Sequence, residues 1–68
     1  QNIYHYLSKC TVDQRSVLIL RFIHSFSIKE TAEALNFSES KVKTTQHRAL
    51  KVLKKYIEAE QERGESTL

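Results

Sequence analysis

Six basic side chains and no acidic one lie between residues 41 and 55: Lys41, Lys43, Arg48, Lys51, Lys54 and Lys55. Residues 1–40 balance four basic side chains against four acidic ones, and residues 56–68 carry four Glu against one Arg. All the positive excess behind the net charge of +3 therefore comes from one short segment. Such a concentration of charge is typical of a polyanion site, and the alternative is a solvated lysine-rich face.

A helix over this segment would separate its residues into two faces, since each residue advances about 100°. The expected inner face is Val42, Gln46, Ala49, Leu53, Tyr56 and Ile57. The expected outer face is Lys43, Thr44, His47, Arg48, Lys51, Lys54 and Lys55, with Lys41 just beyond it. A solvated helix more usually mixes Glu with Lys at i, i+4 spacing. The absence of acid, together with the free N–H groups at a helix start, favours DNA binding.

The sequence shows no arrangement of residues suited to catalysis or metal binding. No two of His5, His24, His47 and Cys10 stand at metal-ligand spacing, and there is no phosphate-binding Gly-rich loop. We therefore expect no enzyme activity, no metal or other cofactor and no small-molecule substrate. Cys10 is expected to lie partly buried between helices, and a single Cys excludes an internal disulfide.

The elements that carry these residues are expected to be helices. The chain has 68 residues, no Pro and one Gly, which favours a single domain of helices joined by tight turns. A first helix is predicted over residues 2–9. Thr11 with Gln14 and Ser27 with Glu30 have the spacing of capping boxes, so they predict the starts of two more helices.

The helix that starts at Thr11 is predicted to end near residues 24–25, and a fourth helix is predicted to run from Ser38 to about Ala59. The third and fourth would form a helix-turn-helix, with Asn36 in a left-handed turn and Ala32 small enough for a close crossing. The sequence thus predicts an all-α, four-helix domain without a sheet over residues 1–59. Residues 60–68 are predicted to form an acidic, frayed tail.

Three stretches of the sequence, residues 27–35, 38–44 and 47–53, resemble region 4 of bacterial RNA polymerase sigma factors. Upstream, residues 7–8, 14–15 and 17–22 are similar to the first part of that region. The similarity is greatest to the extracytoplasmic-function group, and within it to the envelope-stress sigma factors of Gram-positive bacilli. Thr31, where an Ile is usual, and Leu50, where many members carry Arg, depart from the pattern.

The resemblance implies that this domain reads the minus-35 promoter element. By position, Lys43, Thr44 and His47 would contact base edges, and Arg48 would contact a base or a phosphate. Ser40 and Lys41 would lie near the DNA backbone or the groove edge. Arg21 on the second helix and Lys51 on the fourth would lie near phosphates.

The partners that the resemblance implies are double-stranded promoter DNA, core RNA polymerase and an anti-sigma factor. A cytoplasmic location without membrane insertion is expected, because no apolar run approaches the roughly 18 residues of a membrane span. Two alternatives stay open: a response-regulator type of helix-turn-helix, and a protein-interaction module without DNA binding of its own. Response regulators of this type usually dimerise through the last helix, and the basic residues there disfavour a symmetric dimer.

Overall fold

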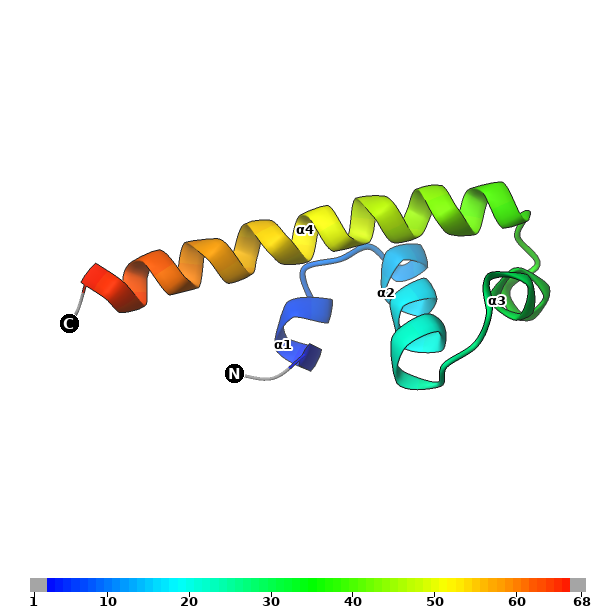
Figure 1. Cartoon of the computed structure of the whole chain (residues 1–68), viewed down its shortest axis with the longest axis horizontal. Helices are drawn as coiled ribbons and strands as arrows, with labels where there is room; N and C mark the ends of the chain where they lie inside the picture. The colour runs from blue at the N-terminus through cyan, green and yellow to red at the C-terminus, as the bar shows by residue number, and fades with distance from the viewer. Residues whose placement is uncertain (1–2, 67–68) are drawn as a thin grey trace.

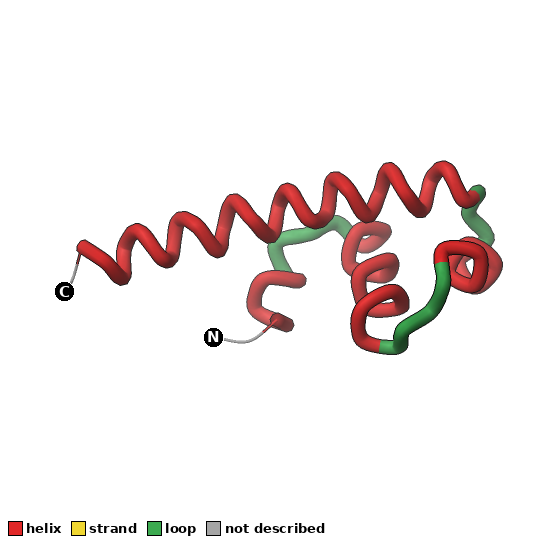
Figure 2. The backbone as a smooth tube through the Cα atoms, in the orientation of Figure 1, coloured by secondary structure: helices red, strands yellow, loops and turns green. Residues whose placement is uncertain are grey.

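The computed structural model describes residues 3–66, and it describes the side chains of residues 4–60. The elements are α1 (Ile3–Leu7), α2 (Val12–Leu18), the π-helical turn η1 (Ile19–Ile23), α3 (Ile28–Leu35) and α4 (Glu39–Ser66). All the regular structure in residues 3–66 is helical, which confirms the predicted all-α fold (Figure 2).

The long helix α4 organises the molecule. The helices α1, α2 and α3 all lie on one side of it, and each packs against it (Figure 1). The result is an elongated shape of 46 × 19 × 16 Å whose long axis follows α4. One face of the first half of α4 is therefore covered by α2 and α3, while the opposite face is left to solvent.

Both predicted capping boxes are present. The Thr11 hydroxyl accepts a hydrogen bond from the Gln14 N–H at 3.2 Å, and the Gln14 side chain accepts one from the Thr11 N–H at 3.0 Å. Ser27 and Glu30 make the same reciprocal pair at 3.0 and 2.8 Å. These side chains satisfy N–H groups that a helix start leaves without partners, so they set where α2 and α3 begin.

The turn between α3 and α4 also follows the prediction. Asn36 is left-handed, with φ 57° and ψ 42°, and the N–H of Phe37 donates to the carbonyl of Ala32 at 2.9 Å. The Ser38 hydroxyl then accepts a hydrogen bond from the Lys41 N–H at 3.0 Å and caps α4. A left-handed residue followed directly by a cap gives the short connection that a helix-turn-helix requires.

The core consists of two apolar clusters beneath α4. Val17, Ala32 and Val42 meet where α2, α3 and α4 come together, which places Ala32 at the expected crossing. The second cluster joins α1 and α2 to the middle of α4, and its members are Leu7, Cys10, Leu18, Ala49 and Leu53. Burial raises the pKa of the Cys10 thiol, and the charge of Arg15 opposes that rise.

Several boundaries and one inner-face assignment differ from the predictions. The first helix ends at Leu7 rather than at Lys9, because Lys9 and Cys10 donate to carbonyls three residues back and close a turn. Tyr56, predicted to face inward, is 39% exposed, with the Lys9 ammonium 5.6 Å from its ring centre.

The predicted end of the fourth helix near Ala59 is wrong, because α4 continues as helix to Ser66. A contact from the start of the chain holds this part of α4. The Tyr6 hydroxyl donates to Glu60 Oε2 at 2.6 Å, and His5 Nε2 lies 3.1 Å from Glu60 Oε1. Residues 67–68 of the predicted tail, and Asn2 of the predicted first helix, lie outside the described residues.

The second helix ends where the sequence predicts, but in a form that it does not predict. From Ile19 to Ile23 the helix widens into a π-turn, and the His24 N–H donates to the Ile19 carbonyl five residues back at 3.0 Å. Ser25 follows with φ 60°. Short π-helical turns are rare and are frequent at functional sites, so the side chains of η1 are of particular interest.

Candidate nucleic-acid interface

The first half of α4 presents a polar and basic face to solvent. The residues of this exposed face are Ser40, Lys41, Lys43, Thr44, His47, Arg48 and Lys51. On the opposite side of the helix Val42 and Ala49 are fully buried, each with 0% exposure. All the site residues predicted on this helix thus lie on one continuous surface, which we call the basic face.

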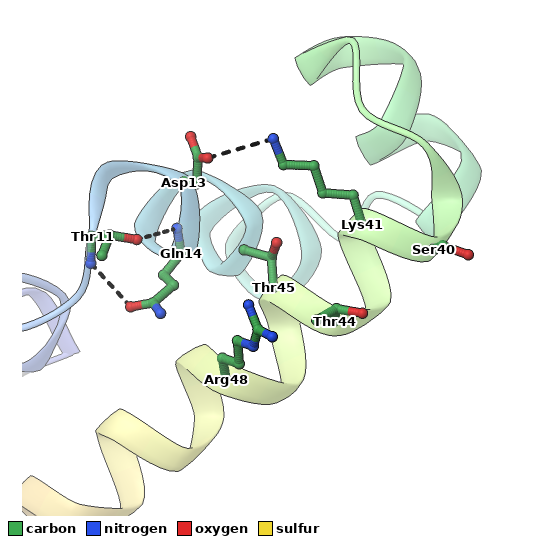
Figure 3. Close-up of a pocket in the computed structure, with 8 residues that line it drawn as sticks. All are labelled: Thr11, Asp13, Gln14, Ser40, Lys41, Thr44, Thr45 and Arg48. Carbon is green, nitrogen blue, oxygen red and sulfur yellow. Dashed lines mark hydrogen bonds and ion pairs between the residues drawn. The ribbon is translucent and has the colours of Figure 1, made fainter.

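A shallow groove runs beside the basic face, between α4 and the start of α2 (Figure 3). One side of the groove is formed by Thr11, which caps α2, and by Asp13 and Gln14 of α2. The other side is formed by residues of α4: Ser40, Lys41, Thr44, Thr45 and Arg48. Sequence reasoning missed the α2 side of this groove. No local pattern could have indicated it, because these residues meet only through the packing of α2 on α4.

Lys41 is the residue of the basic face with the most defined surroundings. Its ammonium lies 4.0 Å from the ring centre of Phe37 and 3.8 Å from Asp13 Oδ2. The Lys41 and Asp13 side chains are both about half exposed, so the ion pair contributes little to stability. The ring and the carboxylate therefore position the ammonium at the edge of the groove, and the ammonium stays exposed to solvent.

Arg21 is the one predicted site residue that the structure places away from the basic face. It lies on η1 and is half-buried. Its Nε donates to Gln46 Oε1 at 2.9 Å, and its Nη1 donates to the carbonyl of Phe26 at 2.6 Å. Two of its donors thus bind within the protein.

An apolar groove lies on a different part of the surface. It is lined by Leu7, Leu18, Phe22, Ile23, Leu50 and Leu53. Phe22, Ile23 and Leu50 are exposed, although the apolar run that contains the first two predicts burial. Phe22 and Ile23 both belong to the π-helical turn η1, none of whose residues is fully buried.

No group of three or more His, Cys, Asp or Glu side chains among the described residues could hold a metal ion. No helix of the described part is long and apolar enough to cross a bilayer.

Comparisons with known proteins agree with this geometry. Residues 1–53 match the sequence profile of the family described as "Sigma-70, region 4". The chain is 67% identical over 58 residues to the ECF RNA polymerase sigma factor SigX of Bacillus subtilis, a match that covers 85% of this chain and 30% of that protein.

Two more distant relatives point the same way. The RNA polymerase sigma-E factors of Streptomyces avermitilis and Streptomyces antibioticus are 48% and 49% identical to it over 46 and 45 residues. These matches cover 68% and 66% of this chain, and 26% and 25% of the two relatives. The chain thus spans less than a third of the length of the curated relatives it matches. With a four-helix fold, a helix-turn-helix and this sequence match, the chain belongs to the sigma-70 region 4 family.

Proposed function

We propose that this chain binds the minus-35 element of promoter DNA, as region 4 of an extracytoplasmic-function sigma factor that directs RNA polymerase to promoters. The observation that carries the proposal is the basic face of α4. The second helix of a helix-turn-helix lies in the major groove, which is wide enough to admit one helix. In this chain that helix is α4, and its exposed side is basic where its other side is buried.

Roles within the basic face follow from the position of each residue along α4. We assign base edges to Lys43, Thr44 and His47, near the start of the helix, and a base or a phosphate to Arg48. We assign the DNA backbone to Ser40, Lys41 and Lys51. Lys54 and Lys55 lie about 16 Å further along the helix than Lys43 and Thr44, so we expect them to contribute less to base reading.

The proposal includes partners and a location. Core RNA polymerase and an anti-sigma factor are the protein partners that the family membership supports, and the exposed apolar groove offers a protein partner a surface to bind. The role is one of recognition without catalysis, and it is carried out in the cytoplasm.

A binding panel tests the DNA part of this proposal. The preferred duplex is first selected from a random library, and the affinities for all its single-base variants are then measured. Lys43→Ala should change discrimination by about 1–3 kcal/mol at one or two base pairs, because it removes a base contact. Arg48→Ala should do the same where Arg48 contacts a base, and should weaken all duplexes alike where it contacts a phosphate. Lys55→Ala removes the same charge from the same helix and serves as the control.

The two alternatives predict other results. If Lys43→Ala and Arg48→Ala leave both affinity and base preference unchanged, the basic face does not read DNA and the chain is a protein-interaction module. A complex of two chains on a palindromic duplex, measured by sedimentation, would instead support the response-regulator type.

A further inference from the structure

Arg21 joins three segments of the fold that are separate in the sequence. Its own backbone belongs to η1, its Nη1 donates to the carbonyl of Phe26 between η1 and α3, and its Nε donates to Gln46 on α4. The guanidinium places its donors in a rigid fork, so it can hold two acceptors in a fixed relation. The distances of 2.6 and 2.9 Å are those of well-formed hydrogen bonds.

The connection after η1 is fixed on both sides of Phe26. The Phe26 N–H donates to the carbonyl of Leu20 at 2.8 Å, and the Phe26 carbonyl accepts from Arg21. Ser25, directly before it, has the left-handed backbone that turns the chain out of the π-helical turn. The Phe26 carbonyl is therefore a firm anchor for the guanidinium rather than part of a loose loop.

At the other end of the contact, Gln46 is half-buried and lies on the inner side of α4, between Val42 and Ala49. Both of these neighbours are small, fully buried members of the two apolar clusters. Apolar attraction has no preferred direction, so a polar contact can add to what packing contributes to the rotation of the helix about its axis. A charge-assisted hydrogen bond is directional and can fix that rotation.

The rotation of α4 matters because Gln46 is next to residues of the basic face. His47 follows it directly, and Lys43 lies one turn before it. A small turn of α4 about its axis would move these side chains across the floor of the major groove, where neighbouring base pairs present different donors and acceptors. The rotation of α4 would thus affect which base edges the basic face meets.

We infer that Arg21 is a positioning residue, which acts through Gln46 to fix the rotation of α4 and thereby the base preference of the basic face. This inference rests on the proposed function. It differs from the phosphate contact that the sequence resemblance implies for Arg21, and the two make different predictions about salt.

The test compares Arg21→Ala, Gln46→Ala, the double variant and Arg21→Lys in the complete 68-residue chain. The control is Lys55→Ala, which also removes one positive charge. For each, affinity is measured for the selected duplex, its single-base variants and an unrelated duplex, at two salt concentrations. Circular dichroism gives each melting temperature, so that binding is compared only where the chain is folded.

The expected result is loss of preference without loss of general DNA binding. Each of Arg21→Ala and Gln46→Ala should weaken binding to the selected duplex about tenfold, because each removes the charge-assisted hydrogen bond between Arg21 and Gln46. The double variant should be no weaker than either single one, because the two residues act as one unit. Affinity for the unrelated duplex and the salt slope should match those of the unmodified chain.

Other results would overturn the inference. If Arg21→Ala weakens all duplexes alike and reduces the salt slope by about one, while Gln46→Ala does not, then Arg21 is a phosphate contact. If both variants melt earlier but keep the original base preference, the pair is only structural. If Arg21→Ala is unfolded, Arg21→Lys and Gln46→Ala decide, since lysine lacks the two-acceptor fork and should also lose preference.

A final outcome concerns the proposed function itself. If the unmodified chain prefers no duplex in the library selection, the function fails, and the inference about Arg21 fails with it. If the unmodified chain has a preference and the Arg21 variants keep it, only the inference fails.

Discussion

The start of α3 is stabilised by the carboxylate of Glu30, so its stability depends on whether that carboxyl group is ionised. The Ser27 N–H donates to this carboxylate at 2.8 Å, which lowers the pKa of Glu30 below its usual 4.5. Since the folded pKa is the lower one, the charged form stabilises the fold. That stability is present above about pH 4.5 and is lost as the pH falls through the folded pKa.

The variant Glu30→Gln keeps an acceptor for the cap but does not ionise. We expect it to be less stable than the unmodified chain at pH 7, with the difference shrinking as the pH falls below 4. Urea unfolding at a series of pH values measures this, with Glu33→Gln on the same helix as the matched control. A difference that stays constant down to pH 3 would contradict the assigned role of the Glu30 charge.

The pKa of Tyr6 shifts upward, in the direction opposite to that of Glu30, so its effect on stability falls at high pH. Its hydrogen bond to the Glu60 carboxylate, followed by burial and the Glu60 charge, raises its pKa above the usual 10.0. The neutral phenol therefore stabilises the fold, fully below pH 10, and this contribution is lost as the pH rises through the folded pKa.

Tyr6→Phe should accordingly lower the melting temperature at pH 7, because it removes the donor to Glu60. The gap to the unmodified chain should narrow above pH 10. Tyr4→Phe is the control, because Tyr4 is exposed on the same short helix. Equal melting temperatures for Tyr6→Phe and the unmodified chain at pH 7 would show that the bond does not hold α1 on α4.

At the scale of elements, Ala32 is buried with Val17 and Val42 where α2, α3 and α4 meet. Ala32→Leu should destabilise the fold by about 1–3 kcal/mol, because added methylenes in a close-packed site force neighbours out of place. Chemical denaturation measures the loss. Ala34→Leu, two residues on and exposed, provides the comparison and should change stability by less than about 0.5 kcal/mol. Similar losses in both variants would place the crossing elsewhere.

The features of these elements that the sequence predicts are the local ones. Both capping boxes, the Asn36 turn and the Ser38 cap depend on residues a few positions apart, so their spacing is enough. The basic face likewise depends only on the period of one helix. The sequence shows that Thr31 departs from the family pattern, but it does not show how a hydroxyl is accommodated there. In the structure the buried Thr31 hydroxyl donates a hydrogen bond to the Ser27 carbonyl at 2.8 Å.

The features that the sequence does not predict depend on contacts between distant residues. The extension of α4 past Ala59 accompanies contacts from Tyr6 and His5 to Glu60, more than fifty positions away. Arg21 binds within the protein only because Gln46, on another helix, offers it an acceptor. The groove beside the basic face exists only because α2 packs on α4. Helical periodicity carries no information on any of these pairings.

For the whole molecule, the charge distribution limits how binding responds to salt. Six basic residues lie between positions 41 and 55, so the plot of log affinity against log salt should be no steeper than about −5 for duplex DNA. Lys51→Ala should make it shallower by about one, because Lys51 is assigned to the backbone. Titrations from 50 to 300 mM salt measure the slope, and a slope near zero would contradict contact with phosphates.

The continuity of α4 has a mechanical consequence. A helix of 28 residues is about 42 Å long, and Glu60 lies some 16 Å from the pivot that Ala49 provides at the core. By that lever arm, a tilt of about 10° at Ala49 would carry Glu60 roughly 3 Å, further than a hydroxyl–carboxylate hydrogen bond can stretch. By holding Glu60, the short helix α1 therefore limits how far α4 can tilt, and so it fixes the direction of the helix end that we propose binds DNA.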